Sequence, residues 1–144
     1  MPPDPRALST AGYSSTWLWK KPGYKAGLAA YVESPPAEYE ALLDLPPDLV
    51  VEWLGKPVRG VAFVHLFTTN AVSLQKKLSN LRKLVASDGV IWVSWPKKSL
   101  GVVTDVTEDV IRAIALPLGL VDIKVCAIDE VWSGLKLMIR KTER

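Results

Sequence analysis

The sequence predicts a single α/β domain with a mainly parallel sheet and helices on both of its faces. Its length of 144 residues is typical of one domain. Hydrophobic residues make up 49% and charged residues 23%, a balance that excludes a disordered or collagen-like chain. Short apolar runs alternate with amphipathic helical patterns, as is typical of parallel strands joined by crossover helices.

The beginning of the chain, residues 1–24, is predicted to be a lead-in to a domain over residues 25–144. Four of the eleven prolines lie in this lead-in, and such a composition disfavours regular structure. Trp17, Leu18 and Trp19 are expected to pack onto the domain, because exposed indole rings are unfavourable. No signal-peptide pattern and no apolar run of ~18 residues is present, so a soluble cytoplasmic protein is expected.

The predicted strands and helices alternate along the domain. In chain order they are strand 27–34, helix 37–45, strand 48–54, strand 60–68, helix 70–85, strand 89–95, helix 106–116, strand 121–128 and strand 132–140. Pro35–Pro36 and Pro46–Pro47 end the first strand and the first helix, because proline lacks a backbone donor and fixes φ. The strand at 60–68 is a continuous apolar run, which is typical of a strand covered on both faces.

The later elements have individual signals. The helix at 70–85 has an apolar stripe at helical spacing and a basic opposite face. Its stripe is Leu74, Leu78, Leu81 and Val85, and its basic residues are Lys76, Lys77, Arg82 and Lys83. The helix at 106–116 is expected to begin at Asp105, with Glu108 completing a capping box. Only residues 129–131 join the last two strands, which are therefore predicted to be antiparallel neighbours.

A parallel sheet that ends in an antiparallel hairpin resembles the Rossmann-like methyltransferase fold with a strand pair removed. The resemblance implies a three-layer sandwich with strand order 2-1-3-4-6-5. Its topological switch point would then lie between strands 1 and 3, where open α/β sheets bind their ligands.

Two sequence stretches stand out, residues 89–99 followed by Thr104–Asp105, and residues 129–136. Together with residues 23–27 before the first strand, they resemble a domain-of-unknown-function family of small bacterial Rossmann-like proteins. That family pairs a strand end of the W-x-x-P-K type with a later D-E-x-W-S turn. The resemblance covers roughly residues 22–140 and implies a fold rather than an activity. The proline- and tryptophan-rich beginning departs from it.

The two motifs are expected to meet where the fourth strand ends and the last strand begins. Two lysines beside a helix N-terminus could bind an anion, and a tryptophan could stack on a ring. The candidate ligand-binding residues are Trp95, Lys97, Lys98, Ser99, Asp105, Asp129, Trp132 and Ser133. The simpler alternative is that the lysines pair with Asp129 and Glu130, contributing ~0–1 kcal/mol each, and that the tryptophans close the core.

The switch point offers weaker signals. A dinucleotide or S-adenosylmethionine domain has glycines after the first strand, but this chain has Glu33-Ser34-Pro35-Pro36 there. Glu52 is expected near the end of the second strand, where an acid would meet a ribose, although a solvated edge residue is the simpler interpretation. Thr68, Thr69 and Asn70 are interpreted as helix-capping residues. No cofactor is therefore expected.

Single reactive residues are interpreted structurally. His65 lies inside an apolar run and is predicted to be a hydrogen-bonded core histidine, and Cys126 is predicted to pack in a strand. One histidine and one cysteine exclude a multi-histidine or cysteine-rich metal site. No catalytic residue is assigned.

The first functional interpretation is a non-enzymatic domain that binds a small anion or mediates an interaction. A net charge of +3 is too weak to indicate nucleic acid, no membrane contact is expected, and a homodimer is allowed. The first alternative is a diverged methyltransferase-like transferase. The second is a protein–protein interaction module anchored by Trp17, Trp19 and Trp53.

Overall fold

The computed structural model describes residues 22–37, 39–98 and 101–144. Trp17, Leu18 and Trp19 lie outside the described residues, as does Ser99. The described elements are β1 (Ala29–Glu33), α2 (Tyr39–Leu43), β2 (Glu52–Leu54), β3 (Val61–Phe67), α3 (Ala71–Leu84), β4 (Val85–Pro96), α4 (Glu108–Ala115), the 3₁₀ turn η3 (Leu116–Leu118), β5 (Leu120–Ala127), β6 (Trp132–Ile139) and the 3₁₀ turn η4 (Lys141–Glu143). Strands and helices therefore alternate in the predicted order.

The strands form one sheet whose order confirms the prediction, β2-β1-β3-β4-β6-β5. β1 runs parallel to both β2 and β3, and β3 runs parallel to β4. β6 lies between β4 and β5 and is antiparallel to both. The switch point between β1 and β3 and the C-terminal antiparallel hairpin are thus both present.

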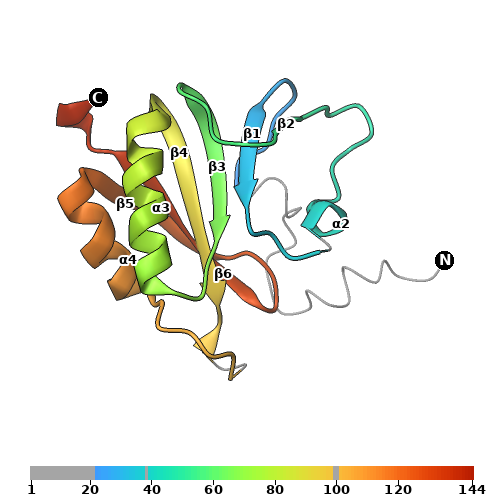
Figure 1. The fold of residues 1–144 in the computed structure, drawn as a ribbon. Coiled ribbons are helices and arrows are strands. Elements are labelled where there is room, and N and C mark those ends of the chain that lie inside the picture. The colour runs from blue at the N-terminus through green and yellow to red at the C-terminus, as the bar shows by residue number, and fades with distance from the viewer. Residues whose placement is uncertain (1–21, 38, 99–100) are drawn as a thin grey trace.

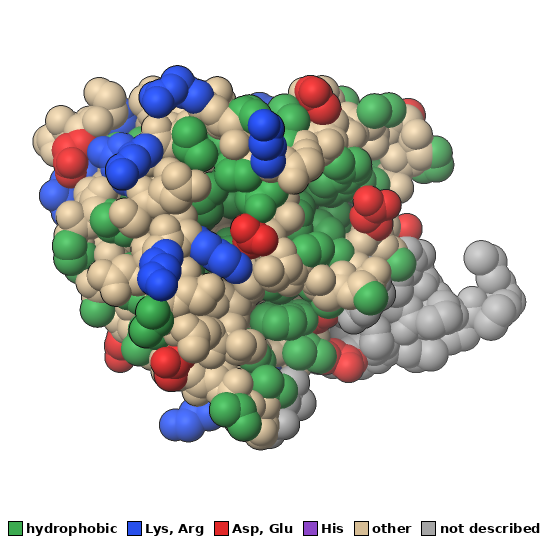
Figure 2. Space-filling view, in the orientation of Figure 1, with side chains coloured by type: hydrophobic (Ala, Val, Ile, Leu, Met, Phe, Trp, Pro, Cys, Tyr) green, Lys and Arg blue, Asp and Glu red, His purple; other side chains and the backbone are tan. Residues whose placement is uncertain are grey.

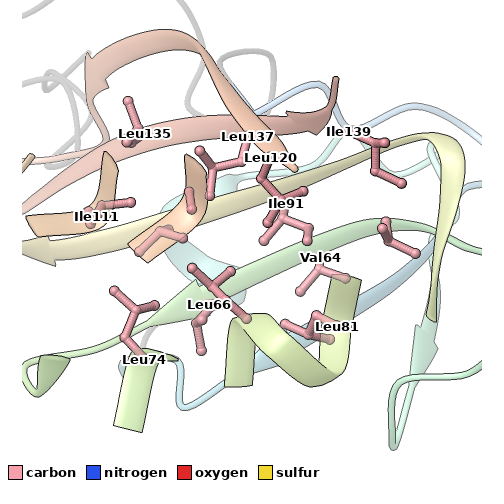
Figure 3. Close-up of a cluster of buried hydrophobic side chains, with 14 of the residues drawn as sticks. Val64, Leu66, Leu74, Leu81, Ile91, Ile111, Leu120, Leu135, Leu137 and Ile139 are labelled. Carbon is pink, nitrogen blue, oxygen red and sulfur yellow. The ribbon is translucent and has the colours of Figure 1, made fainter. Parts of the chain in front are cut away.

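Two helices cover one face of this sheet (Figure 1). α3 and α4 pack their apolar stripes onto β3, β4 and β6, and the leucines of the α3 stripe are almost completely buried. Figure 3 shows side chains from these helices and strands pointing into one cluster, which we call the helix-side cluster. Its most buried members include Val64, Leu66, Leu74, Ile91 and Leu137.

The opposite face carries a second apolar group, which we call the aromatic cluster. Its residues are Tyr24, Leu28, Ala30, Tyr39, Leu43, Val51, Phe63, Phe67, Trp92 and Ile128. α2 contributes Tyr39 and Leu43 to it, so α2 lies on the face opposite to α3 and α4. The indole of Trp92 donates a 2.8 Å hydrogen bond to the backbone oxygen of Pro22, which fastens the segment before β1 to this face.

β2 and β4 differ more from their predicted lengths than the other strands do. β2 has only three residues, because the backbone N–H of Leu49 bonds to the oxygen of Pro46 and residues 46–49 form a turn instead. β4 begins at Val85, directly after α3. A Cβ on Gly89 would lie 2.7 Å from Val85 Cγ2, so only glycine allows the irregular start of this strand.

The predicted start of α4 is wrong. Thr107 is the N-cap, and its side chain accepts a 3.2 Å hydrogen bond from the backbone N–H of Val110. Asp105 instead accepts a 2.7 Å bond from the N–H of Ala71, at the first residue of α3. Glu108 pairs with Arg112 at 2.7 Å and does not complete a capping box. Asp105 therefore ties the loop after β4 to α3.

Candidate functional site

The carboxyl ends of β1 and β3 form the switch point, where open α/β sheets bind ligands. The chain leaves β1 through Ser34, whose φ of 55° lies in the left-handed region. Pro35 and Pro36 follow, and neither has a backbone N–H to donate. The loop after β1 therefore lacks the glycine-lined cradle of a nucleotide-binding site.

Glu33 is a half-buried acid at the end of β1. Its Oε1 accepts a 2.8 Å hydrogen bond from the Tyr31 hydroxyl, and its Oε2 lies 3.5 Å from Ser34 Oγ. Burial and the hydrogen bond to Glu33 raise the pKa of Tyr31 to about 12, so the hydroxyl stays a donor at neutral pH. The pair fixes a negative charge at this edge of the sheet.

The acid predicted to follow the second strand is not there. Glu52 is exposed and begins β2, and its backbone N–H bonds to Leu28 near the start of β1. The residue that ends β2 is Leu54. The predicted place of Glu52 near the end of the strand is wrong, because the turn at 46–49 shortens the strand from its beginning. The simpler interpretation of Glu52 as a solvated edge residue is confirmed.

The polar residues after β3 support α3, as predicted. Asn70 caps the helix, and its Oδ1 accepts a 2.8 Å hydrogen bond from the N–H of Ser73. The Thr68 hydroxyl exchanges 3.2 Å bonds with the backbone of Asn70. The backbone oxygen of Thr69 accepts bonds from the Thr104 hydroxyl and the Asp105 N–H. These groups fix the loop geometry at the carboxyl edge.

The two sequence motifs do meet at the carboxyl end of β4. Pro96 pairs with Trp132, and Trp95 pairs with Ser133. The Lys97 ammonium donates to the backbone oxygen of Asp129, and the Lys97 N–H bonds to Val131. Lys97 thus ties the end of β4 to the β5–β6 turn through main-chain acceptors.

Asp129 builds the turn between β5 and β6. Its Oδ1 accepts bonds of 2.8 and 2.7 Å from the N–H groups of Val131 and Trp132, and the residue is only 8% exposed. Lys98 and Glu130, in contrast, are exposed.

The two tryptophans of the candidate site lie on different faces of the sheet. Trp95 packs against the helix-side cluster, and Trp132 packs against the aromatic cluster. Trp132 meets Phe67 edge-on with ring centroids 5.0 Å apart. The structure therefore brings Lys97, Asp129 and Trp132 together. Trp95 and its cross-strand partner Ser133 face the other way, and Asp105 bonds to the start of α3.

A chain of four buried polar side chains crosses the aromatic cluster. The hydroxyls of Tyr24 and Tyr39 are 2.7 Å apart, the Tyr39 hydroxyl lies 2.8 Å from His65 Nδ1, and His65 Nε2 lies 2.7 Å from Ser94 Oγ. His65 and Ser94 are completely buried. The prediction that His65 is a hydrogen-bonded core histidine is confirmed.

Burial sets the protonation states in this chain. It lowers the pKa of His65 to about 3, so the imidazole is neutral at neutral pH. Burial also raises the pKa of Tyr24 and of Tyr39 well above the usual range, so both phenols stay protonated. The sequence did not indicate the hydrogen bonds of Tyr24, Tyr39 and Ser94. These residues come from separate segments whose local patterns indicate packing alone.

Other features of the described residues are structural. Cys126 is half-buried on β5 against the aromatic cluster, less enclosed than predicted. Among the described residues, no group of His, Cys, Asp and Glu side chains could hold a metal ion. No described helix is long and apolar enough to cross a membrane.

An open groove of about 390 Å³ lies between α3 and α4. Its lining residues are Ala71, Val72, Gln75, Val110, Ala113, Ile114, Pro117 and Leu118. None of them is ionisable, so this groove offers no acid, base or nucleophile for catalysis.

Charge is distributed unevenly over the chain. Between residues 26 and 55 the sequence has six acidic residues and no lysine or arginine. These acids are Glu33, Glu38, Glu40, Asp44, Asp48 and Glu52. Figure 2 shows Lys and Arg side chains over α3 and hydrophobic side chains beside it, over β3 and β1. Glu52 begins β2 at the opposite edge, but Glu33 at the end of β1 and Glu40 on α2 give this side of the carboxyl edge a negative potential.

Comparison with solved structures finds proteins with a similar fold. A SAM-dependent methyltransferase from Aquifex aeolicus matches with a TM-score of 0.62 and 16% identity, covering 94% of each chain. An O-methyltransferase of neocarzinostatin biosynthesis, NcsB1, matches with a TM-score of 0.60 and 14% identity over 90% of this chain and 51% of its own. LepI in complex with SAM matches with a TM-score of 0.54 and 13% identity.

The present chain spans about half the length of some of these structures, 47% in the case of LepI. No protein-family model matches the sequence, and no curated protein matches it. The Rossmann-like methyltransferase fold is therefore established by structure alone, and the domain-of-unknown-function resemblance supplies no family assignment.

These likenesses correct the first functional interpretation. The interpretation as a non-enzymatic domain that binds a small anion or mediates an interaction is contradicted, because structures that match almost the whole chain include a SAM-dependent methyltransferase and an O-methyltransferase. Their fold agrees with the alternative of a methyltransferase-like transferase, although this chain has no glycine directly after β1.

Proposed function

We propose that this protein is a methyltransferase-like transferase that uses a sulfonium donor of the S-adenosylmethionine type. The observation that carries the proposal is the match to the Aquifex aeolicus methyltransferase over 94% of both chains. A match of that extent includes the switch point, where the fold binds its cofactor.

Charge at the switch point supports a cationic donor. S-adenosylmethionine carries a positive sulfonium, and Glu33 places a carboxylate at the carboxyl end of β1. The acids on and around α2 add to the same potential without a neighbouring base between residues 26 and 55. An anionic nucleotide such as NAD would be repelled at this place.

Backbone geometry at the switch point does not fit the donor in the conformation seen here. Pro35 and Pro36 offer no N–H groups, and β2 ends without an acid for the ribose. The Tyr39 ring packs against Phe67 at the end of β3, with centroids 5.4 Å apart. The carboxylate of Glu33 thus matches the positive charge of the donor. The Tyr39 ring, however, covers the end of β3 and closes this edge of the sheet.

The candidate residues at the carboxyl end of β4 are proposed to lie beside the methyl acceptor. Lys98 is exposed, and Trp132 is half-buried next to Phe67 on the aromatic side of the sheet. Lys97 and Asp129 would position this wall through the turn that they build.

Isothermal titration calorimetry with S-adenosylmethionine and S-adenosylhomocysteine tests the proposal on the full chain. We expect the sulfonium to bind more tightly than the neutral thioether, and Glu33→Gln to weaken sulfonium binding several-fold. Glu52→Gln is the matched control, since it removes the same charge from an exposed residue at the start of β2. No heat with either compound at millimolar concentration would overturn the proposal.

A further inference from the structure

α2 is a short helix that cannot be stable by itself. It has five residues, far fewer than the ~12–15 that an isolated helix needs in water. Its position therefore depends on its tertiary contacts. Tyr39 and Leu43 are buried, with 5% and 1% exposure, while Glu40 and Ala41 are exposed to solvent. Among the described side chains of the helix, these two connect it to the domain core.

The contacts of Tyr39 combine ring packing with hydrogen bonds. Its ring lies edge-on to His65 and to Phe67, each with centroids 5.4 Å away. Its hydroxyl bonds to His65 on β3 and to Tyr24 before β1. Ser94 on β4 fixes the other ring nitrogen of His65 at 2.7 Å. The hydroxyl of one residue therefore links α2 to a rigid, fully buried support.

Both ends of the α2 segment have unusual backbone conformations. Ser34 and Asp44 have φ of 55° and 51°, and they are the non-glycine residues in the left-handed region among those described. Such conformations are unfavourable for residues with a Cβ, and they persist where surrounding contacts impose them. Pro35–Pro36 and Pro46–Pro47 stiffen the chain beside these two positions. The contacts of α2 therefore hold a segment whose backbone is strained at both ends.

The surface beneath Tyr39 is the carboxyl end of β3, next to the end of β1. If α2 moved away, Phe67 and the edge of His65 would become accessible, with Trp132 beside Phe67. That is the place where this fold binds its ligands and where the described edge is closed.

We propose that α2 is a lid over the carboxyl ends of β1 and β3, held closed by the hydrogen bonds of the Tyr39 hydroxyl, and that it must open for the sulfonium donor to enter. The identity of the entering ligand rests on the proposed function; the opening of the lid does not. In the closed state the donor site is covered, so apparent affinity is reduced by the fraction of molecules that are open.

Hydrogen exchange measured by mass spectrometry tests the lid without any ligand. In the wild-type chain we expect the amides of residues 39–44 to exchange faster than those of β3 and β4, through an opening smaller than global unfolding. Tyr39→Phe keeps the ring and removes both hydroxyl bonds, and should raise exchange in residues 39–44 by roughly ten-fold with β3 and β4 unchanged.

Two further variants keep this result interpretable. Tyr31→Phe removes a tyrosine hydroxyl bond of the same 2.8 Å length on β1 and should leave α2 exchange unchanged. Tyr24→Phe removes only the outer bond of Tyr39 and should give an increase smaller than that of Tyr39→Phe. Equal exchange rates for residues 39–44 and the β3–β4 core in wild type would overturn the lid, as would an unchanged α2 rate in Tyr39→Phe.

Titration of Tyr39→Phe with S-adenosylmethionine tests what the lid admits. We expect the dissociation constant to fall by the same factor as α2 exchange rises. Faster α2 exchange with unchanged or weaker donor binding would overturn the gating role. Faster α2 exchange with no donor binding to any variant would retain the lid and overturn the proposed function.

Discussion

Gly134 on β6 tests how tightly the aromatic face of the sheet is packed. A Cβ at this position would lie 2.8 Å from both Cδ1 and Cγ1 of Ile128 and 3.2 Å from Cε3 of Trp92. The end of the Ile128 side chain can shift, but the Trp92 ring cannot easily do so. It is completely buried, and its indole N–H is bonded to the Pro22 oxygen at 2.8 Å. We therefore expect Gly134→Ala to be destabilising.

The expected loss is about 1–3 kcal/mol, the usual effect of adding a methyl group to a filled core. For a domain of this size each kcal/mol lowers Tm by roughly 3–4 °C. Urea unfolding followed by circular dichroism measures the free energy of unfolding, with an unchanged m-value showing that the denatured state is the same.

Gly55→Ala is the matched control, because no atom lies within 4 Å of its Cβ position and its φ is not left-handed. It should be neutral, or stabilising by up to about 1 kcal/mol through the unfolded state. The packing argument would be refuted if Gly134→Ala were as stable as Gly55→Ala.

Three other substitutions have defined outcomes, all measured by urea unfolding. Asp129→Ala should lose about 1–3 kcal/mol because it leaves two turn N–H groups without their acceptor, whereas exposed Glu130→Ala should change stability by less than about 0.5 kcal/mol. Asp105→Ala should lose about 1 kcal/mol at the start of α3, and an effect no larger than that of exposed Asp88→Ala would contradict the bond to Ala71. For His65, the unfolded chain binds a proton near pH 6.5 and the folded chain does not until about pH 3, so folding loses about 2 kcal/mol between pH 7 and pH 5. His65→Gln should lack that loss, and equal pH slopes for the two proteins would contradict a neutral buried imidazole.

Much of the fold was predictable because its signals are local. Proline pairs follow β1 and α2, the leucine stripe identifies α3, and a connection of only four residues requires the β5–β6 hairpin. The start of α4 was not predictable in this way. Asp105 and Thr107 are both good capping residues, and the choice between them depends on the N–H of Ala71, 34 positions earlier.

The candidate site was predictable in place but not in detail. The pairing of Pro96 with Trp132 follows from strand order, so the two motifs were expected to meet. Alternation along β4 and β6 then puts Trp95 and Trp132 on opposite faces, a consequence of exact register that sequence patterns do not supply. The polar chain through Tyr39 and His65 joins residues 15, 26 and 29 positions apart, and separation of that kind leaves no local pattern.

The central position of β6 has a consequence for how this chain acquires its structure during synthesis. β6 is made after the other five strands of this sheet, yet it lies between β4 and β5 and contributes Leu135, Leu137 and Ile139 to the helix-side cluster. Until residue 139 is available, β4 has an open edge and α3 and α4 have an incomplete surface to pack on. The nascent domain therefore exposes apolar surface until β6 is made, a state in which strand edges are prone to aggregate and chaperones bind.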